Sequence, residues 1–102
     1  MKQVIIVIPR GSANLSSISG SYEILTRANE YWRMMGNRPM LDVRLAGFMR
    51  EVTLDVGFFS IHPANINEIK KPDLVIIPSL AHQYDQMLRD NKELIAWIKE
   101  QY

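Results

Sequence analysis

The chain has 102 residues, of which 47% are hydrophobic and 23% are charged, and its formal net charge is +1. This length suits a single domain with a modest core, and so small a net charge argues against a surface built to hold nucleic acid or an anionic membrane. The absence of cysteine excludes disulfides, thiolate metal sites and a cysteine nucleophile within these residues.

The first apolar run is VIIVI at residues 4–8, and Pro9 follows it directly. A run without polar alternation predicts a strand that is covered on both faces, as in a parallel sheet. The run is too short for the core of a signal peptide or for a transmembrane helix. We therefore expect a cytoplasmic protein without a membrane segment.

The next stretch, PRGSANLSSISG at residues 9–20, is a long loop rich in serine and glycine. It has neither the phosphate-loop pattern nor the closely spaced glycines of a dinucleotide site, so turn and cap roles are favoured for its small residues. In open α/β sheets, ligands bind beyond the carboxyl ends of the strands. Arg10 and Gly11 are therefore candidate ligand-binding residues, and Arg10 is either a partner for an anionic group or a solvated side chain.

A helix is predicted from about Glu23, and Gly36, Asn37 and Pro39 end it. Glu23 would lie in the first turn, where the helix macrodipole stabilises a carboxylate by about 0.3–1 kcal/mol. That structural role and a role in a functional site are both open interpretations of Glu23. Apolar residues at helical spacing carry the helix prediction: Ile24, Leu25, Ala28, Tyr31, Trp32 and Met35.

The middle of the chain reads as short strands. LDVRLAG at residues 41–47 alternates in polarity, which predicts a more exposed strand with Leu41, Val43 and Leu45 on one face. REVTL and GFFSI flank Asp55-Val56-Gly57, a plausible hairpin turn. HPANINEI at residues 62–69 then predicts a turn with at most a short helix.

The last third begins with LVII at residues 74–77, a second continuous apolar strand. Asp90 and Glu93 form a capping pair for a final helix whose inner face carries Leu94, Trp97 and Ile98. The loop between them, PSLAHQYD, also lies beyond a strand end, so Ser79, Leu80 and His82 are candidate ligand-binding residues. His62 and His82 have no partner at metal-ligand spacing, and we predict neither a metal nor a cofactor.

The order strand, helix, strand, hairpin, strand, helix predicts an α/β fold: a doubly wound, mostly parallel, flavodoxin-like sheet with a small β-hairpin. The sequence ends in its last helix with no strand after it, so we expect the incomplete first half of such a sheet. Residues 1–102 show no basic stripe and no helix-turn-helix pattern, and we expect no DNA-binding module among them.

Five stretches together resemble a known family, through their order and spacing over nearly the whole chain. The resemblance is to the first half of the ThiJ/PfpI-type, class I glutamine amidotransferase-like domain, in the version fused ahead of AraC-type helix-turn-helix modules in bacterial transcriptional regulators. The stretches are SISGSYEILTRAN, DVRLAG, VTLDVGFFSI, PDLVIIPSL and ELIAWIKEQY.

The resemblance implies that VIIVI lies between LDVRLAG and DLVIIP in the sheet. It also places Glu23 at the family's acidic position, with Ser21 where proline is usual, facing a cysteine elbow expected after Tyr102. Many enzymes of the superfamily carry Pro-Gly-Gly after the strand that corresponds to residues 74–77, and their backbone amides bind an oxyanion. Here Ser79 and Leu80 follow Pro78. Their side chains would restrict the close approach of a substrate to the backbone. We therefore expect no catalysis.

The function expected from the resemblance is that of an N-terminal sensing and dimerisation domain of an AraC-type regulator. Its partners would be an unknown small-molecule effector, DNA only through a further module, and a second copy paired through the edge strand at residues 74–77. Two alternatives remain. One is the front half of a ThiJ/PfpI-type enzyme, amidase, hydratase or protease-like, whose cysteine elbow lies beyond Tyr102. The other is a small interaction domain without a ligand.

Overall fold

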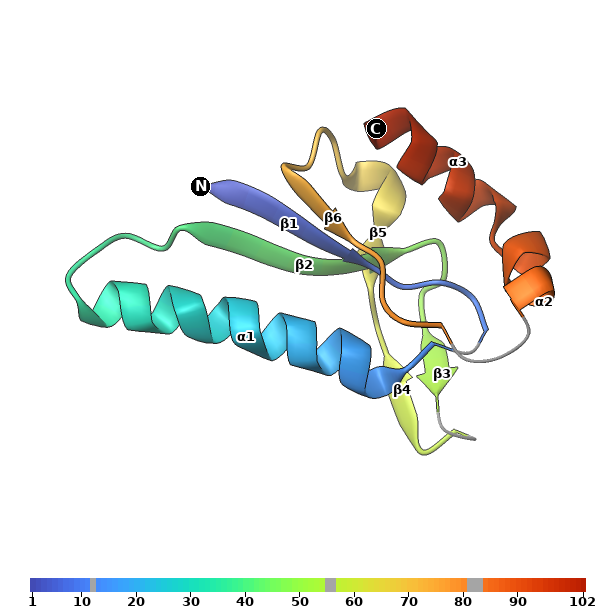
Figure 1. Cartoon of the computed structure of the whole chain (residues 1–102), viewed down its shortest axis with the longest axis horizontal. Helices are drawn as coiled ribbons and strands as arrows, with labels where there is room; N and C mark the ends of the chain where they lie inside the picture. The colour runs from blue at the N-terminus through green and yellow to red at the C-terminus, as the bar shows by residue number, and fades with distance from the viewer. Residues whose placement is uncertain (12, 55–56, 81–83) are drawn as a thin grey trace.

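The computed structural model describes residues 1–11, 13–54, 57–80 and 84–102. Two layers of helix lie on opposite sides of a central sheet (Figure 1). The elements in chain order are β1 (Lys2–Val7), α1 (Leu15–Met34), β2 (Leu41–Gly47), β3 (Val52–Leu54), β4 (Phe59–Ile61), β5 (Ala64–Asn65), the 3-10 helix η1 (Ile66–Glu68), β6 (Leu74–Ile76), α2 (Tyr84–Asp90) and α3 (Lys92–Gln101).

The main sheet is parallel, with the strand order β5-β2-β1-β6. β3 and β4 form a separate antiparallel hairpin, and Gly57 in its turn has φ +87°. The fold is therefore the mostly parallel α/β sheet with a small hairpin that the sequence predicts. The predicted place of β1 between β2 and β6 is also confirmed.

The core has two parts, one on each face of the sheet. Because side chains alternate along a strand, Ile5 and Val7 of β1 face one way and Ile6 faces the other. The first pair packs with Leu94 and Trp97 of α3. Ile6 packs with residues of α1 and of the hairpin, namely Ile18, Val52 and Leu54. β1 is thus the central strand, and each of its buried side chains contributes about 1.5–3 kcal/mol.

Helix α1 begins earlier than the sequence suggests. Its first residue is Leu15, after Asn14 in an extended conformation, so Glu23 lies well inside the helix and the prediction that it occupies the first turn is wrong. The cause is packing: Leu15 and Ile18 reach the core beside β1, which extends the helix through a serine-rich segment. The predicted end is confirmed, since α1 stops at Met34 and Gly36 has φ +87°.

The apolar spacing of α1 predicts the helix correctly but not its buried face. Among the described residues of the helix only Ile18 is buried, while Ile24 and Tyr31 are exposed. An asparagine ties the second half of α1 to the sheet instead. The Asn29 side chain donates to the Leu41 carbonyl at 2.6 Å and accepts from the Leu41 amide at 2.9 Å.

Two further parts differ from the sequence prediction. HPANINEI contains the two-residue strand β5 as well as η1, because Ile66 is fully buried and draws this segment against β2. The capping pair is wrong: Asp90 ends α2, which was not predicted, and Asn91 precedes α3. The predicted inner face of α3 is confirmed by Leu94 and Trp97. Within the described ranges, no helix is long and apolar enough to cross a membrane.

Candidate ligand site at the carboxyl end of the sheet

The carboxyl ends of β1 and β6 form the crevice where α/β sheets usually hold ligands. After β1 the chain enters α1 on one face of the sheet, and after β6 it enters α2 and α3 on the other (Figure 1). The connections diverge between these neighbouring strands, which is the topological switch point of the sheet. The residues that follow each strand here are therefore candidates for ligand contact.

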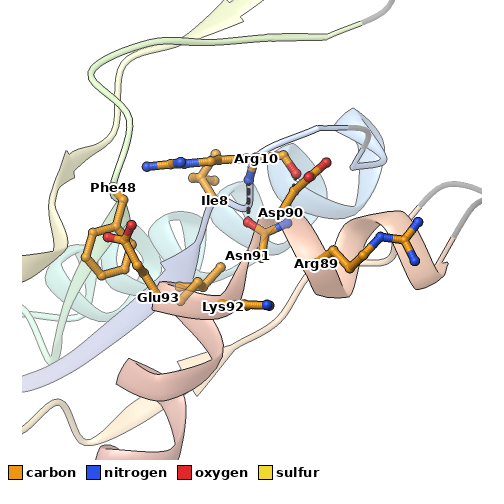
Figure 2. Close-up of a pocket in the computed structure, with 9 residues that line it drawn as sticks. Ile8, Arg10, Phe48, Arg89, Asp90, Asn91, Lys92 and Glu93 are labelled. Carbon is orange, nitrogen blue, oxygen red and sulfur yellow. Dashed lines mark hydrogen bonds between the residues drawn. The ribbon is translucent and has the colours of Figure 1, made fainter.

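A buried asparagine fixes the loop after β1. Asn91 lies at the junction of α2 and α3 and is only 7% exposed. Its Oδ1 accepts from the Arg10 amide at 2.7 Å, and its Nδ2 donates to the carbonyls of Arg10 at 3.0 Å and Met87 at 2.8 Å. Because a single side chain satisfies all three groups, the Arg10 backbone is held firmly against the helices (Figure 2).

A cavity of about 520 Å³ opens beside this clamp. Figure 2 shows the Arg10 side chain running across Ile8 toward Phe48, while Arg89 points away from them. The cavity thus combines three apolar side chains with a mostly charged rim that includes the Arg10 guanidinium. Its lining residues are Ile8, Arg10, Phe48, Arg89, Asp90, Asn91, Lys92, Glu93 and Leu94.

The charges of the cavity are largely uncommitted. In the described part of the chain, the only ion pairs within 4 Å are Lys2–Asp73 and Arg44–Asp42, so the Arg10 guanidinium has no carboxylate partner there. Arg89 and Asp90 are engaged differently, each hydrogen-bonding the side-chain amide of Gln86. An unpaired guanidinium beside an aromatic ring suits a planar or negatively charged ligand group.

Gly11 has a structural role in the same loop. Its φ is +91°, and a Cβ at this position would lie 2.9 Å from the Met87 sulfur. Glycine therefore lets the loop turn and approach α2 closely. Gly11 does not line the cavity, so its part in binding is to shape the Arg10 loop.

The loop after β6 closes onto the start of α1 through a second polar cluster. The Ser79 amide donates to Ser17 Oγ at 2.9 Å, the Ser79 hydroxyl accepts from Asn14 Nδ2 at 2.6 Å, and the Asn14 amide donates to the Ser79 carbonyl at 3.0 Å. Leu80 forms a β-bridge with Ala13. The Ser79 amide is thus hydrogen-bonded within the protein, so it is not free to bind a ligand.

The predicted site residues therefore separate into groups. Arg10 lies in the cavity, while Ser79 and Leu80 hold the loop after β6 against the start of α1 and the residues just before it. Glu23 is exposed on α1 and lines a different, shallow hollow with Arg27 and Glu30. His82 lies outside the described residues.

Sequence reasoning missed Asn91, Phe48 and Ser17. Asn91 follows a short helical segment and precedes the apolar period of α3, which is a helix-cap signal that could have drawn attention to it. Asn91 bonds to Arg10 and Ser17 bonds to Ser79, partners that lie far away in the sequence. No cluster of three metal-binding side chains occurs in residues 1–11, 13–54, 57–80 and 84–102.

The fold is shared with two solved chains. One is a protein from Vibrio parahaemolyticus, provisionally described as a transcriptional regulator, with a TM-score of 0.75 and 24% identity over 97% of this chain and 50% of that one. The other is an AraC family transcriptional regulator from Pseudomonas putida, with a TM-score of 0.61 and 14% identity over 92% of this chain and 60% of that one. The chain thus spans about half the length of the first.

No family model matches the sequence, and no curated protein matches it. The likeness to the two solved chains is therefore one of fold, an α/β sheet of the same arrangement.

Proposed function

We propose that the chain is the sensing part of an AraC-type transcriptional regulator, built as a ThiJ/PfpI-like domain and acting in the cytoplasm. The observation that supports this most is the fold match over 97% of the chain to a protein described as a transcriptional regulator. The second solved match, an AraC family regulator, points the same way. The strand order expected from the family resemblance is also the observed one.

In this proposal the cavity beside Arg10 binds the effector. Asn91 holds the Arg10 backbone in place, and the guanidinium, Phe48 and Glu93 line the space available to a small molecule. Binding there would join the loop after β1 to the start of α3, and so alter how α3 lies on the sheet. DNA contact belongs to a separate module of the regulator.

The proposed domain senses and does not catalyse. A ThiJ/PfpI-type enzyme needs a carboxylate and a free backbone amide near the switch point. Here the Ser79 amide is bonded to the Ser17 hydroxyl, while Glu23 is exposed on another part of α1. The proposal also includes self-association, for which the edge strand β6 offers one route.

The regulator role is tested in the native host by comparing transcripts from wild-type cells, cells lacking the gene and cells carrying Arg10→Ala. Deletion should change a defined set of transcripts, and Arg10→Ala should change the same set because effector binding is lost. A deletion that leaves every transcript unchanged contradicts the regulator role.

The site is tested separately by thermal unfolding of the purified chain with a panel of small carboxylates, amides and phosphates. At least one compound should raise the Tm of the wild type but not of Arg10→Ala. Arg38→Ala is the matched control, since Arg38 is also exposed but does not line the cavity. A compound that raises the Tm of the wild type and of Arg10→Ala equally binds elsewhere, and it contradicts the assignment of this site.

A further inference from the structure

Helix α1 carries an apolar stripe that no described part of the chain buries. Ile24 and Tyr31 are 71% and 64% exposed, and Met35, which caps the end of α1, is 68% exposed. Ala28 is exposed between Ile24 and Tyr31. The four positions follow the alternating spacing of four, three and four residues that forms the seam of paired helices. Ala28, at the middle of the stripe, would let a second helix approach closely.

The stripe lies on the side of α1 that faces the edge of the sheet. It runs roughly 100° around the helix from Ile18, which packs in the core. Seven residues before Ile24 on the same side is Ser17, whose hydroxyl accepts from the Ser79 amide just after β6. The stripe therefore lies on the side of the helix nearer β6. Asn29, which bonds to β2, lies on the other side.

The edge strand adds an apolar side chain to the same surface. Ile76 of β6 packs with the core beside α1, and side chains alternate along a strand, so Leu74 turns to this face as well. Leu74 is 51% exposed. We call the stripe and this side chain together the apolar corner, which consists of Ile24, Ala28, Tyr31, Met35 and Leu74.

The charged side chains that border this corner could pair with those of a second copy of the chain. Arg27 and Glu30 lie together on the outer flank of the stripe and line one shallow hollow with Met34. In the described part of the chain neither forms an ion pair within 4 Å. If two α1 helices lie antiparallel about a centre near Ala28, Arg27 of each copy faces Glu30 of the other.

We propose that the apolar corner is where two copies of this chain pair, with their α1 helices antiparallel across a twofold axis. The pairing rests on the self-association part of the proposed function and assigns it a surface. A twofold interface must be complementary to itself, and both the stripe and the Arg27–Glu30 flank meet that condition. Leu74 of each copy fills the space below the helices, where the two β6 edges approach each other.

A second copy fits this surface better than a membrane does. An amphipathic helix that lies on an anionic bilayer has a flank rich in lysine and arginine, whereas here Glu23 and Glu30 alternate with Arg27 along the flank. The corner is also built from five side chains, fewer than the roughly 20–30 residues that each partner contributes to a standard interface. We therefore expect a weak dimer that forms only at high micromolar concentrations or above.

Sedimentation equilibrium tests the pairing. At about 100 µM the wild type should contain dimers, and Ile24→Glu and Tyr31→Glu should each raise the dissociation constant at least about tenfold, because they bury a carboxylate in the seam. Phe58→Glu is the matched control, since Phe58 is 83% exposed on the hairpin, and it should leave the constant unchanged. Circular dichroism checks that each variant is folded.

Charge exchange tests the antiparallel arrangement. Arg27→Glu alone should weaken the dimer, since it places two carboxylates opposite each other, and the double exchange Arg27→Glu with Glu30→Arg should restore it. A double exchange that fails to restore pairing overturns the arrangement. A wild type that is monomeric at about 100 µM, or association that survives Ile24→Glu and Tyr31→Glu, overturns the surface, and the latter points to the β6 edge alone. None of these outcomes affects Arg10-dependent ligand stabilisation, which tests the proposed function independently.

Discussion

The two faces of the sheet are covered by helices in very different ways. On one face the ten-residue α3 buries Leu94 and Trp97 against Ile5 and Val7. On the other, the twenty-residue α1 buries only Ile18 and leaves Tyr31 and Met34 of its second half largely in solvent. The β1 residues beneath are equally buried on both faces, so helix length does not measure how much a helix contributes to the core.

The comparison predicts that the shorter helix holds more of the stability. Trp97→Ala should lower the free energy of unfolding by about 3–5 kcal/mol, because it removes a large buried side chain and leaves a cavity. Trp32→Ala is the matched change on α1, where the indole is only partly covered, and should cost clearly less. Urea unfolding measures both. Equal losses of unfolding free energy in the two variants would show that α1 contributes as much to stability as α3, against this prediction.

Within α1, the comparison can be sharpened between two isoleucines. Ile18→Ala should cost about 2–5 kcal/mol, since Ile18 is 1% exposed and packs with Ile6 and Ile8. Ile24→Ala should change the stability of the monomer by less than about 0.5 kcal/mol, because Ile24 is largely in solvent. Urea unfolding at low micromolar concentration, where pairing is absent, measures the difference. A large loss for Ile24→Ala would mean that its side chain is buried in the monomer.

The side-chain amide of Asn91 should contribute much of the stability at the junction of α2 and α3. Asn91→Ala removes three hydrogen bonds and leaves the Arg10 amide and carbonyl without these partners, for an expected loss of about 1–3 kcal/mol. Asn37→Ala is the control, since Asn37 is exposed after α1. Thermal unfolding measures the loss, and Asn91→Ala should also weaken any ligand that Arg10 holds. An Asn91→Ala protein as stable as Asn37→Ala would contradict the clamp.

The sequence predicted the long strands because continuous apolar runs carry a strong signal, whereas their order was predicted from the family resemblance. It misplaced the start of α1 because serine, asparagine and glycine favour loops by local preference, and only contacts from Leu15 and Ile18 to the core override that preference. The same error put Glu23 at a helix start. Arg10 could be chosen from its place after β1, but Asn91 could not be paired with it, since 81 residues separate them.

The smallest predicted effect compares two glycines that share a backbone conformation. Gly11 and Gly57 have φ of +91° and +87°, so Gly→Ala at either position should cost about 1 kcal/mol from backbone strain. Among the atoms of the described residues, the new Cβ would meet a neighbour only at Gly11, where the Met87 sulfur lies at 2.9 Å. Methionine is flexible and can move aside, so the additional loss should be under about 1 kcal/mol.

The double variant Gly11→Ala with Met87→Ala removes that clash, and a double-mutant cycle in urea isolates it as a favourable coupling between the two changes. A coupling of zero would mean that the loop after β1 does not press on α2, and that the Asn91 clamp alone holds the Arg10 loop against the helices.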